Sequence, residues 1–388
     1  MKVRSKFARR VADIEPFRVV EVLRRARELE AEGRDIVHME AGEPDFATAA
    51  PVVEAGREAL ARGATYYSDA KGVLQLREAI ARYYREAYGL DIAAERIMVT
   101  PGASGALLLL AALLVDRGDS MLMADPGYPC NRHFLRLVEG EGILVPVDAS
   151  HNFQLTAPLI DQYWQPQTIG ALVASPANPT GTVLDRQQLS AVHNAVGERG
   201  GVLVVDEIYH GLDFGQRAPS ILEITDDAFV INSFSKYFGM TGWRLGWLVA
   251  PEWALDALEK LAQNLFISMS TMAQFAALRC FDADTRTILN QRRDQFEARC
   301  NYLLPELLKL GFDVPAPPAG GLYIYADISR FSNNSAQFCM EMLEQHGLAI
   351  TPGNDFGHHR AGQYVRFAYT TGLERLELAV QRMKRVLG

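Results

Sequence analysis

Cysteine is scarce in this chain of 388 residues, and the scarcity bears on where the protein works and what it can hold. The cysteines stand far apart and form no Cys-x-x-Cys pair; they are Cys130, Cys280, Cys300 and Cys339. This spacing indicates neither a disulfide framework nor a zinc site, and a reducing compartment is the simpler interpretation. His358 and His359 have no further ligand at metal-binding spacing, so we expect a loop there and no metal.

The sequence also lacks a long apolar run and an excess of positive charge. Its most apolar segment, residues 106–115, is too short to span a bilayer. The N-terminus is basic but has no apolar signal core; a transit peptide stays open, although Asp13 and Glu15 argue against one. The net charge of −8 gives no electrostatic reason to expect nucleic acid. We therefore expect a cytoplasmic protein that binds neither membrane nor nucleic acid.

What the chain does contain is a series of short apolar runs rich in branched residues. These runs cover 96–100, 120–124, 142–147, 169–175, 201–206, 228–233 and 244–250. Several are apolar throughout, as strands buried on both faces are, and helical segments separate them. The pattern predicts an α/β fold with a mostly parallel sheet. Beyond about residue 285 a long charged helix and the alternating strands 321–328 and 364–369 predict an α+β part with one solvated sheet face.

Polar, glycine and aromatic residues follow the apolar runs directly. Ligands of open α/β sheets bind where loops leave the carboxyl ends of the strands, so we expect these segments to converge on one rim. The segments are "PGASG" at 101–105, "DPGYP" at 125–129, "PANPTG" at 176–181, "DEIY" at 206–209 and "SFSK" at 233–236.

Two groups of these residues suit a chemical role, and each residue in them also has an ordinary structural explanation. The turn before the helix at 102–115 offers free backbone amides and Ser104 to an anion. Ser233, Ser235 and Arg244 add hydroxyls and a guanidinium, a set suited to a phosphate dianion. Taken singly, each is better explained as a turn serine or a surface arginine.

The other group surrounds one amine. Lys236 ends a strand, where a charged lysine is costly unless it is partnered or used covalently. Asp206 ends an apolar strand and needs a cation or good donors, or else caps a helix. Tyr209 offers a phenol, Tyr128 a stacking face or ordinary packing, and Asn178 lies in a turn.

Together these motifs resemble the class I/II aminotransferases of the fold-type I pyridoxal-phosphate enzymes, the aspartate aminotransferase superfamily. The resemblance spans nearly the whole chain and lies in "GEPDF", "TPGASGAL", "SPANPTG", "VDEIY", "SFSK", "GMTGWRLGW", "PAGGLYIYADI" and "YVRFAY", in this order. It implies a large domain with a mostly parallel seven-stranded sheet sandwiched by helices, and a smaller α+β domain formed by the N- and C-terminal segments. The expected division is an N-terminal arm and part of the small domain at 1–45, the large cofactor-binding domain at 46–285, and the C-terminal small domain at 286–388.

The resemblance also implies roles around pyridoxal 5′-phosphate. Lys236 corresponds to the lysine of the internal aldimine, which the substrate amine displaces and which then moves a proton from Cα to C4′ of the cofactor. Asp206 pairs with the pyridinium nitrogen, and Tyr209 and Asn178 bond the 3′ oxygen of the ring. Tyr128 stacks on the ring face.

The cofactor phosphate is expected on the amides of Ala103 and Ser104, closed in by Ser233, Ser235 and Arg244. Tyr67 corresponds to a tyrosine that reaches the phosphate of the neighbouring subunit, with Tyr66 as the competing choice, so the resemblance implies a homodimer with shared sites. For the substrate, Arg366 grips the α-carboxylate in a bidentate fork, while the backbone of Gly42 and the side chain of Asn178 lie nearby.

The expected activity is transfer of the amino group of an L-amino acid to a 2-oxo acid such as 2-oxoglutarate or pyruvate. No arginine for a side-chain carboxylate can be mapped, and Phe17, Tyr66 and Phe356 would suit a neutral or aromatic substrate unless they are core residues. A β-lyase acting on cysteine conjugates is the alternative on the same fold. A binding module of a transcription regulator is the weakest interpretation, because no basic patch is present.

Overall fold

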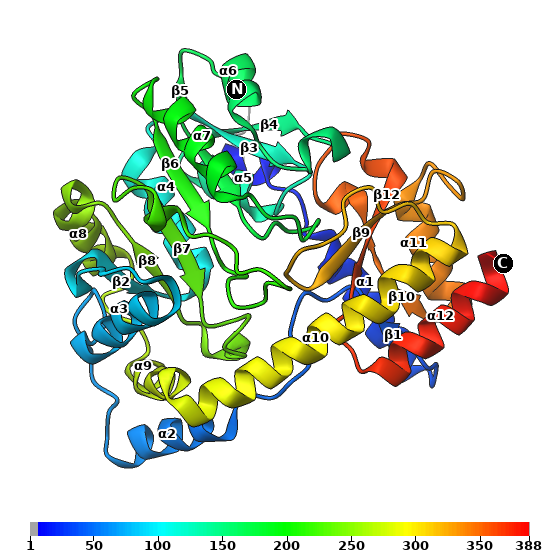
Figure 1. The fold of residues 1–388 in the computed structure, drawn as a ribbon, viewed down its shortest axis with the longest axis horizontal. Coiled ribbons are helices and arrows are strands. Elements are labelled where there is room, and N and C mark those ends of the chain that lie inside the picture. Colours follow the sequence, from blue (N-terminus) through cyan, green and yellow to red (C-terminus); the bar gives the residue numbers. More distant parts are fainter. Residues whose placement is uncertain (1–6, 388) are drawn as a thin grey trace.

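A computed structural model describes residues 7–387 of the chain, and its larger part is built on one seven-stranded sheet (Figure 1). The strand order is β2-β8-β7-β6-β5-β3-β4, and β8 alone runs antiparallel to its neighbours. The strands are β2 (Ile97–Thr100), β3 (Ser120–Asp125), β4 (Glu141–Pro146), β5 (Thr168–Ala174), β6 (Val202–Asp206), β7 (Phe229–Ser233) and β8 (Gly246–Val249). Each matches one of the predicted apolar runs, extending at most one residue beyond it, so the α/β prediction is confirmed.

Helices cover both faces of this sheet, which explains why its strands are apolar throughout. Successive residues of a strand face opposite sides. In β6, Val204 therefore packs with the helices of one face, α4 and α8, whereas Leu203 and Val205 pack with α3 and α7 on the other. The helices of this part are α2 (Ala50–Ala61), α3 (Leu74–Tyr88), α4 (Gly102–Leu114), α5 (Cys130–Leu137), α6 (Ala157–Tyr163), α7 (Arg186–Gly197), α8 (Leu255–Leu265) and α9 (Thr271–Leu278).

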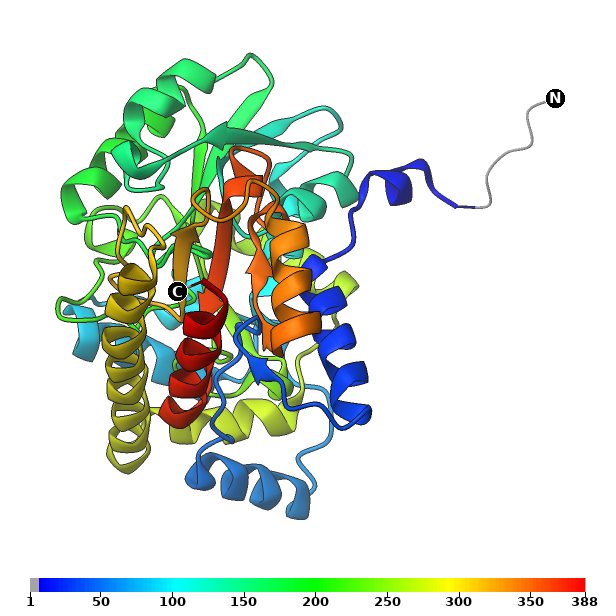
Figure 2. The same cartoon turned by 90° about the vertical axis from the view of Figure 1, so that its right-hand side faces the viewer.

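The smaller part joins both ends of the chain, and the long helix α10 (Ala283–Leu310) runs across to it (Figures 1 and 2). The N-terminal segment enters it because Val37 of β1 pairs with Leu348 of β10 in parallel. A second, antiparallel sheet has the order β11-β12-β9. The elements of the smaller part are α1 (Arg18–Ala31), β1 (Val37–His38), β9 (Tyr323–Asp327), α11 (Ser335–His346), β10 (Leu348–Ala349), β11 (Thr351–Pro352), β12 (Tyr364–Ala368) and α12 (Leu373–Leu387).

The predicted solvated face of this smaller sheet is wrong, because every residue of β9 and β12 is buried. Phe367 on one face packs edge-on against Phe312, with ring centroids 5.3 Å apart. Tyr323 on the other face faces the large sheet, where its hydroxyl lies 2.9 Å from the hydroxyl of Tyr209. The alternation therefore separates an apolar core face from a polar interface between two layers, and that interface borders the site described next.

Several expected absences concern the same described residues. Between residues 7 and 387 no helix is long and apolar enough to cross a membrane. Within the same range no group of metal-ligating side chains is gathered for an ion. All four cysteines carry free thiols.

Candidate active site

The carboxyl ends of the parallel strands meet at one edge of the large sheet, where a cavity of about 450 Å³ opens toward the smaller part. Its volume is that of a site for a cofactor and a small substrate. Residues from most of the predicted segments line it, together with residues of α1, β9 and β12. The lining includes Phe17, Val19, Val20, Leu23, Gly42, Ala103, Ser104, Tyr128, Asn178, Asp206, Tyr209, Ser233, Ser235, Lys236, Arg244, Tyr323 and Arg366.

Lys236 projects into this cavity from the turn after β7. That turn is held by the backbone amide of Ser235, which donates to the hydroxyl of Ser233 at 3.1 Å. The Lys236 ammonium donates to the backbone carbonyl of Gly42 at 2.6 Å and lies 5.9 Å from the ring centre of Tyr209. The carbonyl holds the amine without neutralising its charge, and no carboxylate between residues 7 and 387 forms an ion pair with Lys236.

Asp206 ends β6 and is almost fully buried, 6% exposed. Its carboxylate accepts the backbone amide of Ile208 at 3.0 Å. Burial raises the pKa of Asp206 to about 6, while the hydrogen bond from Ile208 and the charge of Lys236 lower it. A buried carboxylate with one neutral donor favours a cationic N–H group as its next partner.

Tyr209 follows on the same turn, and its hydroxyl is 2.9 Å from that of Tyr323. Burial raises the pKa of Tyr209 well above its ordinary value, so it is a neutral phenol here. Tyr128 closes another wall, where its ring meets that of Phe17 edge-on at 6.2 Å. Phenol and aromatic faces therefore surround the space between Asp206 and Lys236.

The residues expected around a phosphate form a cup at one end of the cavity. Helix α4 begins there at Gly102, and the hydroxyl of Ser233 donates to Ser235 at 3.0 Å. The guanidinium of Arg244 lies directly against Gly102. A Cβ atom on that glycine would be only 2.6 Å from Nη2 of Arg244. Helix amides, hydroxyls and a guanidinium together suit a dianion.

Arg366, from β12, also lines the cavity and is 3% exposed. Its Nη1 donates to Asn178 Oδ1 at 2.9 Å and its Nη2 donates to the backbone carbonyl of Glu40 at 2.6 Å. The ring of Tyr323 stacks on the guanidinium with its centre 4.0 Å away. The Nε atom of Arg366 is buried and has no hydrogen-bond partner among the residues that the structure describes. The fork is thus held in place and keeps donor capacity for a carboxylate.

Some of the predicted residues lie elsewhere. Tyr66 and Tyr67 are 83% and 81% exposed and do not line the cavity. Phe356 is a buried core residue behind Arg366, its ring centre 4.8 Å from the guanidinium, so it forms no part of the mouth. The backbone amides of His358 and His359 donate to the carboxylate of Asp125, as expected of a loop.

Other residues of the site escaped sequence reasoning. Tyr323 was quoted only within a motif, yet it contacts both Tyr209 and Arg366. Glu40 holds Arg366 through its backbone, and its buried side chain accepts from Nδ1 of His38 at 2.7 Å. The side chains of α1 that line the cavity, such as Leu23, also went unnoticed. An acidic residue two positions before "GEPDF" was the available sequence signal.

The cavity fits pyridoxal phosphate by the chemistry of its donors. The cup at α4 suits the phosphate, the buried carboxylate of Asp206 suits a protonated ring nitrogen, and the amine of Lys236, once deprotonated, suits an aldehyde. Gly102 is needed for this fit, because a side chain there would displace Arg244.

Comparisons with known proteins identify the family. The family model for aminotransferase class I and II matches residues 34–383. A valine–pyruvate aminotransferase of Mycobacterium tuberculosis is 36% identical, with 96% of each chain covered. The crystal structure of an aminotransferase from the same organism superposes with a TM-score of 0.96 at 35% identity, covering 99% of both chains.

A more distant relative shows the same fold. The aspartate aminotransferase of Thermus thermophilus, solved with maleate, has a TM-score of 0.93 at 32% identity and covers 99% of this chain and 100% of its own. The chain therefore belongs to the class I and II aminotransferases and is a transaminase that depends on pyridoxal phosphate.

Proposed function

We propose that this transaminase moves the amino group of an L-amino acid with a neutral, apolar side chain to 2-oxoglutarate or pyruvate, with Lys236 carrying the cofactor covalently. The observation that carries the proposal is the placement of Lys236 Nζ, 2.6 Å from the carbonyl of Gly42, in a cavity shared with Asp206 and Arg366. An unneutralised amine, a buried carboxylate and a fixed guanidinium serve an amine exchange at a carbon bearing a carboxylate.

When bound, the cofactor supplies an aldehyde that condenses with amines and a ring that accepts electrons. The residues of this chain do the rest. The Lys236 amine would hold the cofactor and, once freed by the substrate, would accept the proton from the substrate Cα and donate it again. Asp206 would pair with a protonated ring nitrogen, and Tyr209 and Asn178 would offer hydrogen bonds to the ring oxygen. Tyr128 would offer an aromatic face for the ring to pack on.

The preference for a neutral side chain rests on the charges and the apolar wall of the cavity. Within residues 7–387 the cations of the lining are Lys236, Arg244 and Arg366, and the proposed roles already use each of them. The wall from α1 is apolar, with Val20 and Leu23 facing the space. A second carboxylate on the substrate would lose its hydration there without gaining a cation.

The comparisons support this choice only in part. The relative from M. tuberculosis is named a valine–pyruvate aminotransferase, whereas the relative from T. thermophilus is named an aspartate aminotransferase. The decision therefore rests on the cavity of this chain.

Absorption spectra of the holoenzyme, recorded with single L-amino acids and no acceptor, test the proposal. We expect apolar amino acids to convert the visible band of the lysine-bound cofactor to the amine form, and aspartate to do so at least about tenfold less efficiently, as an unpaired buried charge requires. Adding a 2-oxo acid should restore the band.

Efficient conversion by aspartate would contradict the preference for neutral side chains. Release of pyruvate from a cysteine conjugate without any acceptor, together with no conversion by amino acids, would replace the proposed function by the β-lyase alternative.

We also propose that the enzyme is a homodimer and that Tyr67 completes the phosphate cup of the partner subunit. The tyrosine loop is anchored to α9, since Thr271 Oγ1 donates to the carbonyl of Tyr66 at 2.6 Å, yet both tyrosine side chains face solvent. Ile267, close in sequence to α9, is 54% exposed and has a positive φ of 64°. That positive φ ends α8, since the amide of Ile267 donates to the carbonyl of Ala262 at 3.1 Å, and its exposed apolar side chain suits coverage by a second subunit.

Matched phenylalanine variants test the dimer and the choice between the two tyrosines. Tyr67→Phe should raise the dissociation constant of the cofactor about tenfold, because it removes one hydroxyl from a charged phosphate. Tyr66→Phe should leave it unchanged, and sedimentation should give twice the mass of one chain. The reverse pattern would assign the role to Tyr66, and a monomer with full cofactor affinity would refute the shared site.

The domain boundaries and the compartment remain proposals as well. The boundary after residue 285 falls within the first turn of α10, which begins at Ala283, and the first boundary precedes α2. Residues 1–6 and 388 of the proposed outer segments lie outside the described range. Four free thiols suit a reducing compartment, and we propose the cytoplasm.

A further inference from the structure

A histidine of the N-terminal segment lies between two carboxylates, just before the loop that enters the active site. His38 ends β1, a few residues before Gly42. Its Nδ1 lies 2.7 Å from Oε1 of Glu40, and its Nε2 lies 3.1 Å from Oε1 of Glu30, in α1. None of the three side chains lines the cavity, so the roles proposed above leave them unexplained.

These two distances decide how many hydrogens the imidazole carries. A carboxylate oxygen only accepts, so each ring nitrogen at hydrogen-bond distance from one must carry a hydrogen. A neutral imidazole has a single N–H group and can serve only one of the two glutamates. The ordinary pKa of histidine is about 6.5 and that of glutamate about 4.3, so the shared proton belongs on His38 rather than on Glu40. The geometry therefore requires an imidazolium.

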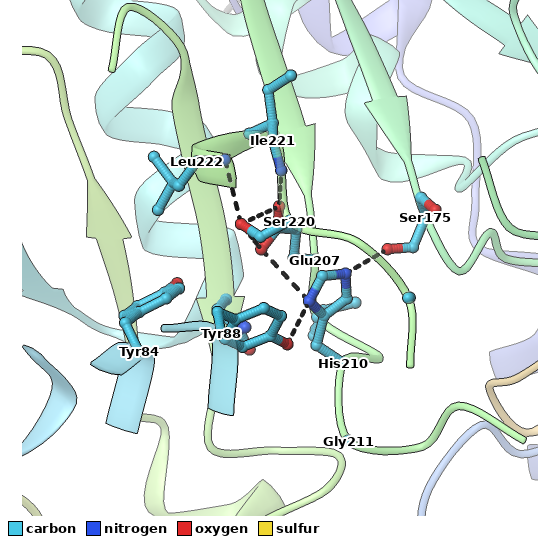
Figure 3. A network of polar contacts seen from close by, with 12 residues as sticks. Tyr84, Tyr88, Ser175, Glu207, His210, Gly211, Ser220, Ile221 and Leu222 are labelled. Atoms are coloured by element: carbon cyan, nitrogen blue, oxygen red, sulfur yellow. Dashed lines mark hydrogen bonds and ion pairs between the residues drawn. The ribbon is translucent and has the colours of Figure 1, made fainter. Parts of the chain in front are cut away.

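A second pair of the same residue types, Glu207 and His210, shows what is particular to His38 (Figure 3). There Nδ1 of His210 lies 2.7 Å from the hydroxyl of Tyr88, and its Nε2 lies 3.0 Å from the carbonyl of Ser175. A hydroxyl can donate and a carbonyl can accept, so a neutral imidazole satisfies both partners. His38 faces acceptors on both sides, and this explanation fails for it.

Glu40 depends on His38 more than Glu30 does. The side chain of Glu40 is fully buried, whereas that of Glu30 is 43% exposed. Oε2 of Glu40 is buried without a hydrogen-bond partner among the residues that the structure describes. An ionised carboxylate in such a place is costly unless a cation lies beside it. The hydrogen bond to Glu40 in turn raises the pKa of His38 to about 9, although burial lowers it.

The other charged groups near β1 do not replace this cation. β10, its strand partner, brings only Leu348 and Ala349 to it. The charged side chains that approach from other elements have other partners; they are Arg375 and Arg382 of α12, which pair with Asp35, and Arg366 of β12, which donates to the carbonyl of Glu40. The charge of His38 is therefore present below a pH of about 9, and its loss above that pH leaves Glu40 without a cation.

Glu40 begins a short segment whose carbonyls hold two cations of the active site. Its own carbonyl accepts from Nη2 of Arg366 at 2.6 Å and from the hydroxyl of Thr351 at 3.1 Å. Two residues later, the carbonyl of Gly42 accepts from the ammonium of Lys236 at 2.6 Å. The path of residues 40–42 therefore sets where both cations point.

We infer that His38 is an imidazolium paired with the buried carboxylate of Glu40, and that the two are positioning residues for Arg366 and Lys236. The pair acts through the backbone of residues 40–42, because its side chains lie outside the cavity. The inference rests on the proposed roles of Arg366 and Lys236.

A single and a double substitution separate the charge of the pair from its packing. His38→Gln keeps a hydrogen donor for Glu40 but removes the cation, so the holoenzyme should bind 4-methylpentanoate, a carboxylate without an amino group, at least about tenfold more weakly at neutral pH. His38→Gln/Glu40→Gln removes both charges and should bind it within about threefold of wild type. Calorimetry measures these affinities. His193→Gln, in α7 and outside the cavity lining, is the matched control and should bind as wild type does.

The order of the variants and the pH profile both test the charge. Weaker binding by the double variant than by His38→Gln would mean that packing explains the effects, and would overturn the inference. As the pH rises past about 9, the affinity of wild type should fall toward that of His38→Gln, whereas the double variant should not show this step. The same step in both proteins would assign it to another group and contradict the role of His38.

Nitrogen NMR of the holoenzyme labelled at histidine needs neither ligand nor turnover. The signals of His38, identified by their absence from His38→Gln, should be those of a ring with two N–H groups at neutral pH and should change to those of a neutral ring above a pH of about 9. A neutral imidazole at neutral pH would overturn the inference, whether or not 4-methylpentanoate binds. This result is distinguishable from failure of the proposed function, which would appear as no conversion of the cofactor by amino acids.

Discussion

Replacing Lys236 with alanine is expected to lower turnover by at least about 10⁴-fold while the protein keeps its fold and still binds the cofactor phosphate. The amine has two proposed tasks, covalent attachment of the cofactor and proton transfer at the substrate carbon. Lys236→Ala removes both. The amine forms its hydrogen bond with the carbonyl of Gly42 and not with a residue of the cup at α4, where Arg244 rests against Gly102, so the cup does not depend on it.

Borohydride reduction followed by peptide mapping checks the attachment directly. Wild type should carry the reduced cofactor on the peptide that contains Lys236, and Lys236→Ala should carry none. Lys260→Ala is the matched control, because Lys260 is an exposed lysine of α8 outside the cavity and should retain both the adduct and the activity. Substantial turnover by Lys236→Ala would refute the mechanism.

The large sheet could be predicted from the sequence because burial on both faces leaves an unmistakable composition. Residues 202–205, for example, are apolar at every position, and β6 indeed packs against helices on both sides. The smaller sheet could not be predicted as well. Alternation in 321–328 shows that its two faces differ in polarity, but tyrosines such as Tyr323 suit a buried interface with another layer as well as they suit water.

The candidate site shows the same division. Asp206, Ser233 and Lys236 could be predicted because they follow parallel strands, whose carboxyl ends must meet at one edge of the sheet. The hydrogen bond that fixes Arg366 could not be predicted, because its Nη2 donates to a backbone carbonyl, that of Glu40. Backbone groups are present at every position and leave no mark in a sequence. Contacts across the subunit boundary, such as that proposed for Tyr67, leave none either.

Asp206→Asn should lower turnover by about 10²–10³-fold with a smaller change in substrate affinity, because it removes one preorganised charge from the electron-accepting ring. The amide fills the same space but cannot stabilise a proton on the ring nitrogen. Because the pKa of Asp206 in the bare cavity is about 6, the carboxyl is largely ionised at neutral pH, and a cationic N–H partner holds it so to lower pH. Wild-type activity should therefore persist below pH 6.

A cofactor analogue methylated at the ring nitrogen provides the control for this substitution. Its positive charge is permanent, so it should restore part of the activity of Asp206→Asn, whereas a defect of packing would not respond to it. Absence of any such recovery would contradict the charge that we assign to Asp206.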